Sequence, residues 1–216
     1  MTKTYLTSLT SLLAAASVYA GTPVAPVAPE PTVVEQNLIS YSNLSLGYNY
    51  TSADFLGVDV DGHGAGIGVE FSPVNHLYLA LRGSWTDIDL VGVDFDYWQG
   101  NAGIGGYIPL TENIHFATEV GASYADLSLA DFNLGTDDWG VYVTPHFRMK
   151  FGAFETHVGV TYNSNDLVTS EYNAFVRLMF EVAPQVDLFV GGNVGLDNGE
   201  AFDNVFGAQA GVRFKF

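Results

Sequence analysis

The sequence has no cysteine, no long apolar run and few basic side chains. The absence of cysteine excludes disulfides, cysteine-based zinc sites and N-terminal lipoprotein acylation. No apolar run reaches about 18 residues, which argues against a membrane-spanning helix. Only 7 Lys and Arg stand against 24 Asp and Glu, for a formal net charge of −17. This charge argues against nucleic acid or an anionic membrane surface as a partner.

What the chain does contain is apolar and aromatic. Hydrophobic residues make up 48% of its 216 residues and aromatic residues 14%, and there are 24 glycines. This composition is too apolar for a disordered chain, and the length suits one domain. Because the apolar residues are scattered, their periodicity decides the fold class.

The end of the chain alternates strictly. From Phe206 to Phe216 every second residue is apolar, and the residues between are Gly, Gln, Arg or Lys. Period-two alternation predicts a half-buried β-strand. A polar residue, a glycine two positions on and two terminal aromatics resemble the C-terminal strand signal of bacterial outer-membrane β-barrels, which implies recognition by the barrel assembly machinery. The residues that carry this resemblance are Gln209, Gly211, Phe214 and Phe216.

The same alternation recurs from Tyr41 onward in ten segments of about ten residues, for example 62–71, 77–86, 97–108 and 154–163. Ten tilted residues span roughly 25 Å, the height of an outer-membrane apolar band. Short connections with Pro or Gly alternate with longer ones that hold nearly all the aspartates, at 51–61, 87–96, 125–138, 164–171 and 196–203. Such asymmetry is typical of the periplasmic and extracellular ends of these barrels.

The predicted fold is therefore all-β, a transmembrane up-and-down antiparallel barrel of ten strands, with eight as the alternative. It resembles the small outer-membrane barrels that include the outer-membrane protein A and W groups. Aromatic residues end the apolar faces near both rims, as two membrane girdles would. A soluble β-sandwich or lipocalin-like barrel is the competing interpretation. It is disfavoured because the polar face is mostly Gly, Asn and Ser rather than Lys, Glu and Thr.

The N-terminus predicts export. Lys3, a short apolar stretch and Val18-Tyr19-Ala20 have the pattern of a signal peptide over residues 1–20. Four prolines in residues 21–38 favour an extended periplasmic tether. The barrel domain is expected over residues 39–216, in the bacterial outer membrane.

The polar parity of the strands carries charges that should enter the barrel. Because isolated charges in a narrow lumen are costly, we expect an ion-pair network across it. A two-residue turn at Gly152-Ala153 would place Lys150 opposite Glu155, and Pro145, which lacks an N–H, predicts a β-bulge. The predicted network consists of Arg82, Arg148, Lys150, Arg177, Arg213, Glu70, Glu119, Glu155 and Glu181.

A ten-stranded lumen should be mostly filled by side chains. We therefore expect a structural or surface-interaction role, with a narrow porin for small solutes as the alternative. The sequence predicts no catalytic residue, cofactor or metal site. Asp61-Gly62-His63 with an Asp pair superficially resembles omptin-type proteases, but these residues have lipid-side parity, so an omptin-like protease is a distant alternative. Expected partners are outer-membrane lipid, the assembly machinery and an unidentified extracellular or periplasmic protein.

Overall fold

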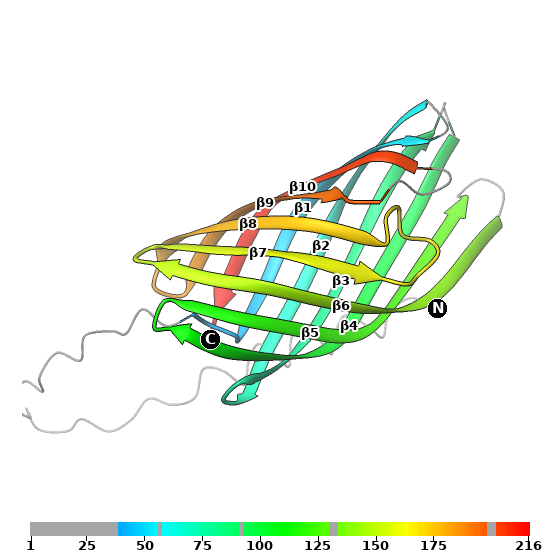
Figure 1. Cartoon of the computed structure of the whole chain (residues 1–216). Helices are drawn as coiled ribbons and strands as arrows, with labels where there is room; N and C mark the ends of the chain where they lie inside the picture. The colour runs from blue at the N-terminus through cyan, green and yellow to red at the C-terminus, as the bar shows by residue number, and fades with distance from the viewer. Residues whose placement is uncertain (1–38, 56–57, 91–92, 130–133, 198–201) are drawn as a thin grey trace, which may run out of the picture. The chain divides into compact units, whose positions relative to one another are not determined.

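The computed structural model describes residues 39–55, 58–90, 93–129, 134–197 and 202–216. They form a closed antiparallel barrel in which each strand pairs with its sequence neighbours and β1 pairs with β10 (Figure 1). The signal peptide and tether expected over residues 1–38 lie outside the described residues. No helix among the described residues is long and apolar enough to cross a membrane. The strands are β1 (Asn43–Phe55), β2 (Val58–Val74), β3 (Leu77–Leu90), β4 (Val93–Thr111), β5 (Ile114–Leu129), β6 (Leu134–Phe151), β7 (Phe154–Asn163), β8 (Tyr172–Ala183), β9 (Val186–Gly195) and β10 (Phe202–Lys215).

The ten-stranded, all-β prediction is confirmed, but three of the expected connections are wrong. The expected connections 51–61, 87–96 and 125–138 are mostly strand, because β1 to β6 continue through them. β4 reaches 19 residues and β6 reaches 18, whereas β7 and β9 have 10 each. The wall of the barrel is therefore tallest over β2 to β6. We call the end of the barrel to which these strands extend the long-strand end. The opposite end, with the tight connections, is the turn end.

The tight turn between β6 and β7 has the predicted register. Phe151 pairs with Phe154, and Gly152 takes the positive φ of 62° that glycine adopts without steric cost. The bulge expected at Pro145 is wrong, because the β6–β7 register is the same on both sides of it. The β6–β7 ladder omits this position, and the proline ring is exposed on the outer face.

Apolar side chains cover the outside of the barrel and charged ones its inside. Leu79, Leu81 and Val141 are 49%, 60% and 56% exposed, whereas Glu119 and Arg148 are each 1% exposed. A water-soluble sandwich would show the reverse. Exposure of apolar side chains to water is unfavourable in free energy, so this exterior is suited to lipid. The interpretation as a soluble β-sandwich or lipocalin-like barrel is therefore wrong.

Aromatic side chains ring the apolar exterior near both ends. At the long-strand side Tyr124 packs on Trp139, with ring centroids 4.8 Å apart, and at the turn end Phe154 packs on Phe180 at 4.9 Å. Trp139 is 68% exposed. Membrane barrels carry girdles of aromatic residues at both interfaces, so these two groups of aromatic side chains mark the expected membrane boundaries.

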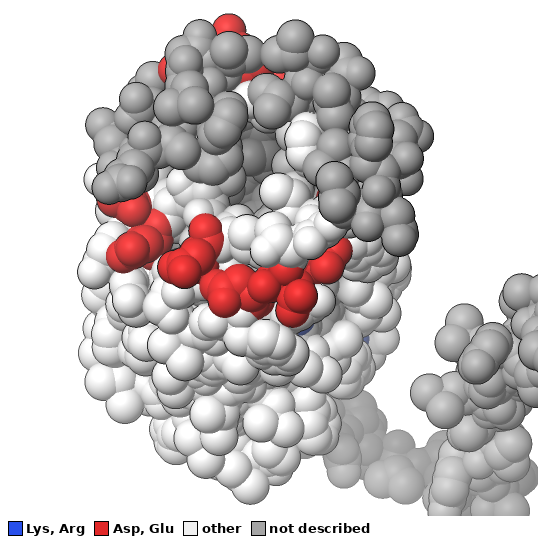
Figure 2. All heavy atoms as spheres, turned by 90° about the vertical axis from the view of Figure 1, so that its right-hand side faces the viewer, with Lys and Arg blue, Asp and Glu red and all other residues white. Residues whose placement is uncertain are grey.

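Beyond the long-strand girdle the polarity of the two faces reverses. Asp61, Asp87 and Asp137 point outward and are exposed, on the same parity as the lipid-facing residues nearer the turn end. Figure 2 looks at this end of the barrel and shows acidic side chains gathered along it. The strands therefore leave the apolar layer here and continue as a wall built for water. The inward positions of this wall are mostly apolar and buried or half-buried: Ala53, Val60, Ile88, Phe95, Tyr97, Ala125 and Leu127.

Candidate functional site: the charged barrel interior

The turn end of the interior begins with a four-residue ion cluster from β6, β8, β9 and β10. Lys215 Nζ lies 2.6 Å from Glu181 and 3.0 Å from Asp187, and Lys150 Nζ lies 3.3 Å from Glu181. Lys150 thus pairs with Glu181 rather than with Glu155, its directly opposite neighbour in the backbone register. The cluster joins strands that are distant along the chain.

Deeper in the barrel Arg213 connects two carboxylates. Its guanidinium lies 2.5 Å from both Glu155 and Asp187, and all three side chains are at most 4% exposed. His157 Nε2 lies 2.7 Å from Glu155. Charge-assisted bonds of this length are the strong kind, and they satisfy carboxylates that burial alone would destabilise.

A second chain of ion pairs crosses from β6 to β5. Glu70 accepts two hydrogen bonds of 2.9 Å from Arg148 and a third of 2.9 Å from Arg82. Arg82 also donates to both oxygens of Glu119, which accepts a 2.5 Å bond from the Tyr142 hydroxyl as well. We call these two systems and the four-residue cluster the charge network: Arg82, Arg148, Lys150, Arg213, Lys215, Glu70, Glu119, Glu155, Glu181 and Asp187.

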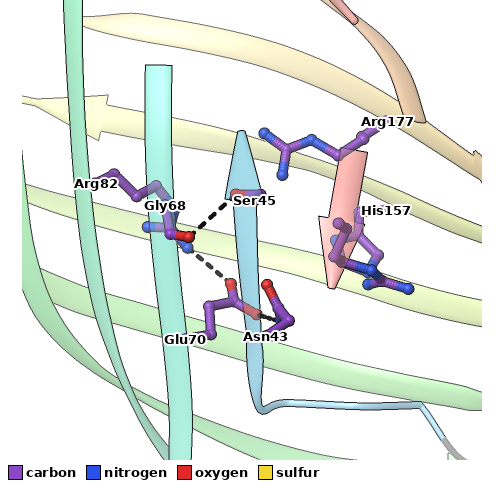
Figure 3. Close-up of a pocket in the computed structure, with 8 residues that line it drawn as sticks. Asn43, Ser45, Gly68, Glu70, Arg82, His157 and Arg177 are labelled. Carbon is purple, nitrogen blue, oxygen red and sulfur yellow. Dashed lines mark hydrogen bonds and ion pairs between the residues drawn. The ribbon is translucent and has the colours of Figure 1, made fainter. Parts of the chain in front are cut away.

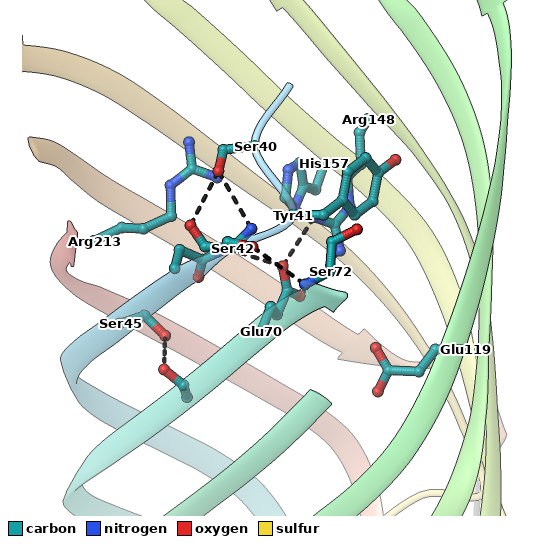
Figure 4. Close-up of polar contacts among 12 residues, drawn as sticks. Ser40, Tyr41, Ser42, Ser45, Glu70, Ser72, Glu119, Arg148, His157 and Arg213 are labelled. Atoms are coloured by element: carbon teal, nitrogen blue, oxygen red, sulfur yellow. Dashed lines mark hydrogen bonds and ion pairs between the residues drawn. The ribbon is translucent and has the colours of Figure 1, made fainter. Parts of the chain in front are cut away.

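The residues just before β1 enter the barrel and complete its filling at the turn end (Figure 4). Tyr41 is 3% exposed and stacks on Tyr107 with centroids 3.9 Å apart. The Arg148 guanidinium lies 4.3 Å from the Tyr41 ring centroid, a cation–π contact. Burial raises the pKa of the Tyr41 phenol, so it keeps its proton beside His115, 3.2 Å away. We call the aromatic residues Tyr41, Tyr78 and Tyr107 the aromatic plug.

Arg177 differs from the other predicted network members. Its guanidinium donates to the Gln209 side chain at 2.9 Å and lies 5.0 Å from the Phe189 ring centroid. No carboxylate among the described residues forms an ion pair with it. The structure therefore brings eight of the nine predicted residues into ion pairs and leaves Arg177 apart, facing a small cavity (Figure 3).

Toward the long-strand end the interior becomes neutral. Asn49 donates to Thr86 at 2.9 Å, and Ser123 donates to Asn163 at 2.8 Å. The side-chain oxygens of Asn49 and Asn101 have no protein hydrogen-bond partner among the described residues. Polar groups of this kind are normally satisfied by ordered water.

Asp187, Lys215 and the aromatic plug were missing from the predicted set, although a signal existed for all of them except Tyr41. Asp187 was the one aspartate outside the long connections, and Lys215 has the same inward parity as Arg213. Tyr78 and Tyr107 occupy polar-parity positions of β3 and β4. Tyr41 gave no periodic signal because it precedes the first strand.

Two interior glycines make room for buried tyrosines. A side chain at Gly105 would overlap the ring of Tyr78, and one at Gly103 would overlap the Tyr142 hydroxyl. Tyr78 is fully buried, so it could not move aside without displacing its neighbours. These glycines therefore serve the filled lumen rather than a turn.

The residues of the omptin-like alternative lie on the outer surface. His63 Nδ1 is 2.6 Å from the Tyr48 hydroxyl, and Tyr50 donates to Asp61 at 2.6 Å. All four belong to the outward parity of β1 and β2. The described residues contain no group of three or more His, Asp or Glu side chains positioned to hold a metal ion.

The residues of the C-terminal signal fall on both faces of β10 and, for Phe216, just after its end. Phe214 and Phe216 point outward and are 40% and 66% exposed. Gln209 contacts Arg177 inside the barrel, and a side chain at Gly211 would overlap Phe189 and the backbone of β1.

Together, an apolar belt with aromatic borders outside and ion pairs inside define a small outer-membrane β-barrel. No protein-family model matches the sequence, and no curated protein sequence matches it. Similar solved structures include Neisserial surface protein A, with 14% identity over 82% of this chain and 98% of that chain and a TM-score of 0.47. The NanC porin has 12% identity, 80% and 100% coverage and a TM-score of 0.49. OprG from Pseudomonas aeruginosa has 10% identity, 83% and 98% coverage and a TM-score of 0.40.

Proposed function

We propose that this barrel has a structural or surface-interaction role and does not form an open pore. The observation that carries the proposal is the continuous filling of the turn half by the charge network and the aromatic plug. Side chains from β2, β3, β5 and β6 form ion pairs across the axis, Arg213 of β10 pairs with Glu155 of β7, and Tyr41 contacts Arg148. A cavity beside Arg82 and Arg177, among the described residues, measures about 10 Å³. A space of this size holds about one water molecule, so it is no path for solutes.

Planar-bilayer recording tests the closed lumen. The wild-type protein is expected to show no steady conductance, because every route through the turn half crosses ion pairs or stacked rings. The variant Tyr41→Ala/Arg148→Ala removes the plug contact and one side of the network, so it should conduct. Trp139→Ala, on the outer surface, is the matched control and should remain closed. A reproducible open state of the wild type would contradict the proposal.

A narrow channel for small solutes is the second candidate. One observation favours it. Between the charge network and the long-strand end the interior is polar but neutral, and there the side-chain oxygens of Asn49 and Asn101 lack a protein hydrogen-bond partner among the described residues. In that case the wild type would conduct, and Arg82→Ala or Arg177→Ala would change the conductance. Catalysis has no comparable support, because Asp61 and His63 face outward and bind tyrosines.

A surface-interaction role requires the long-strand end to face the cell exterior. The tall wall of β2 to β6 supports this orientation, since its outer face beyond the girdle is acidic. Because the chain has no cysteine, an Asp137→Cys variant can be labelled on intact cells with a bulky maleimide. It should react there, while Pro184→Cys, at the turn end, should react only after the outer membrane is permeabilised. The opposite pattern would invert the proposed orientation.

We also infer that residues 1–20 direct export and that Phe214 and Phe216 are read during assembly. Their exposure on the outer face of β10 leaves both rings available to a partner before the barrel closes. Deleting Phe216 should lower the amount of folded barrel in the outer membrane. Phe71→Ala, which removes an outward ring from a different strand, should have a smaller effect.

A further inference from the structure

The charges inside the turn half do not balance. The charge network together with Arg177 contains six cations and five carboxylates. Every cation except Arg177 lies within ion-pair distance of a carboxylate. The three interior histidines, His115, His146 and His157, are neutral or positive, so they cannot offset the excess. One positive charge is therefore left over in the described interior, at Arg177.

Arg177 is half-buried, and a charge in a narrow interior is costly where it has little water and no carboxylate beside it. The Gln209 side chain and the face of Phe189 offer Arg177 only neutral contacts. The nearby carboxylate of Glu70 is fully engaged, with two bonds from Arg148, one from Arg82 and one of 3.0 Å from Asn43. No carboxylate of the charge network is left over for Arg177, so the compensating charge has another source.

The place for such a charge lies beside Arg177. A cavity of about 10 Å³ is bordered by Arg177, Arg82, Arg213 and His157, with Asn43 and Ser45 completing its wall (Figure 3). Its size is that of one water molecule or a small monatomic ion. Glu70 also borders the cavity, but its carboxylate is already paired with Arg82 and Arg148.

We propose that this cavity binds one small monovalent anion of the halide class, held chiefly by Arg177. The anion neutralises the excess charge, and the cavity excludes larger oxyanions by size. This inference does not depend on the closed lumen, because an anion at Arg177 fits a closed barrel and a narrow channel equally well.

Bromide is the probe, because its anomalous scattering distinguishes it from water. Crystals of the full barrel soaked in sodium bromide should show an anomalous peak in the cavity beside the Arg177 guanidinium. Arg177→Gln, which keeps a donor for Gln209, should lose the peak. Lys215→Gln makes the same charge change elsewhere in the network and should keep it. A wild-type cavity without bromide would overturn the proposal, and so would a peak that persists in Arg177→Gln, which would mark an adventitious ion only.

Thermal unfolding in detergent gives an independent readout that needs no crystals. At equal ionic strength, the midpoint in sodium bromide or chloride should exceed that in sodium gluconate and rise with halide concentration, since a ligand of the folded state stabilises it. The halide effect should persist in Lys215→Gln and vanish in Arg177→Gln. Equal midpoints of the wild type in halide and gluconate would contradict the proposal.

Discussion

In the turn half of the barrel, ionised side chains from facing strands contact one another across the axis. In the long-strand half the inward residues are amides and hydroxyls, and beyond the girdle they are apolar. The outer surface changes in step, from apolar beside the network to acidic beyond the girdle. Each level of the wall is matched to its surroundings: charged side chains point inward where the outer surface faces lipid, and outward where it faces water.

The largest expected effect is the loss of a network carboxylate. Glu70→Gln leaves Arg148, which is 1% exposed, without its charged partner. Breaking a buried pair in this way should lower the free energy of unfolding by about 3 kcal/mol. The control in the neutral half is Ser123→Ala, which removes one neutral hydrogen bond worth about 1 kcal/mol. Urea unfolding in lipid vesicles, followed by the gel shift of the folded barrel, compares the two. Equal losses would mean that the halves do not differ energetically.

Positive charge introduced on the outer surface should distinguish the two levels of the wall. Leu81→Arg places a cation in the apolar belt and should cost about 2–4 kcal/mol, whereas Asp87→Arg, on the same face of β3, should cost less than about 1 kcal/mol. The same unfolding assay measures both. A similar cost at the two positions would place Asp87 within the lipid and remove the polarity reversal.

A smaller effect is expected from filling the space beside Tyr78. Gly105→Ala adds a methyl group that overlaps the buried ring, so overpacking should cost about 1–3 kcal/mol. Gly83→Ala lies on the outer face of β3, where the nearest atoms would be 3.9 Å away. It should leave stability nearly unchanged. Gly105→Ala at wild-type stability would show that the plug is loosely packed.

The smallest effect is expected from loss of the Asp197 carboxylate, which is hydrogen-bonded to the connection between β7 and β8. The Asp197 carboxylate accepts hydrogen bonds from the Ser170 hydroxyl and from the backbone N–H groups of Glu171 and Tyr172. Burial opposes ionisation, but these bonds outweigh it and lower the pKa of Asp197. Its stabilisation is therefore present above the unfolded pKa of about 3.9 and is lost as the pH falls through the lower folded value.

Asp197→Asn removes this stabilisation at neutral pH. Limited proteolysis within residues 164–171 should be faster in the variant at pH 7, and the difference should shrink as the pH falls below about 4. Asp166→Asn, in the same connection, is the control with the same charge change. A difference that stays constant with pH would assign the effect to packing instead.

The sequence predicted the barrel because each strand obeys a local rule. Alternation at positions such as Leu79 and Leu81 shows which residues point out of the barrel. The two-residue turn at Gly152-Ala153 fixes the register between β6 and β7. Strand ends were harder to predict. Beyond Trp85 the alternation continues with its polarity reversed, so the aspartates at 87 and 89 resembled a loop although β3 runs through them.

The sequence predicted which charged residues point into the barrel better than it predicted which of them form ion pairs with each other. Parity places Arg82, Glu70 and Glu119 inside, since each lies on the polar face of its strand. Which carboxylate each cation contacts depends on side-chain reach across the lumen, so Lys150 bypasses its opposite neighbour Glu155. Tyr41 stands at the start of the alternating region but before the first strand, so its contact with Arg148 could be known only from the folded chain.

The most direct test of the account is the accessibility of single spin labels along β3, which the absence of native cysteine makes straightforward. The two probes are oxygen, which dissolves in lipid, and a water-soluble nickel chelate. Labels at Leu79 and Leu81 should collide with oxygen, and the label at Asp87 should collide with the chelate. The label at Ala80, which points into the barrel, should be shielded from both. A label at Leu81 that meets the chelate, or one at Asp87 that meets only oxygen, would contradict a wall whose faces change polarity at the membrane boundary.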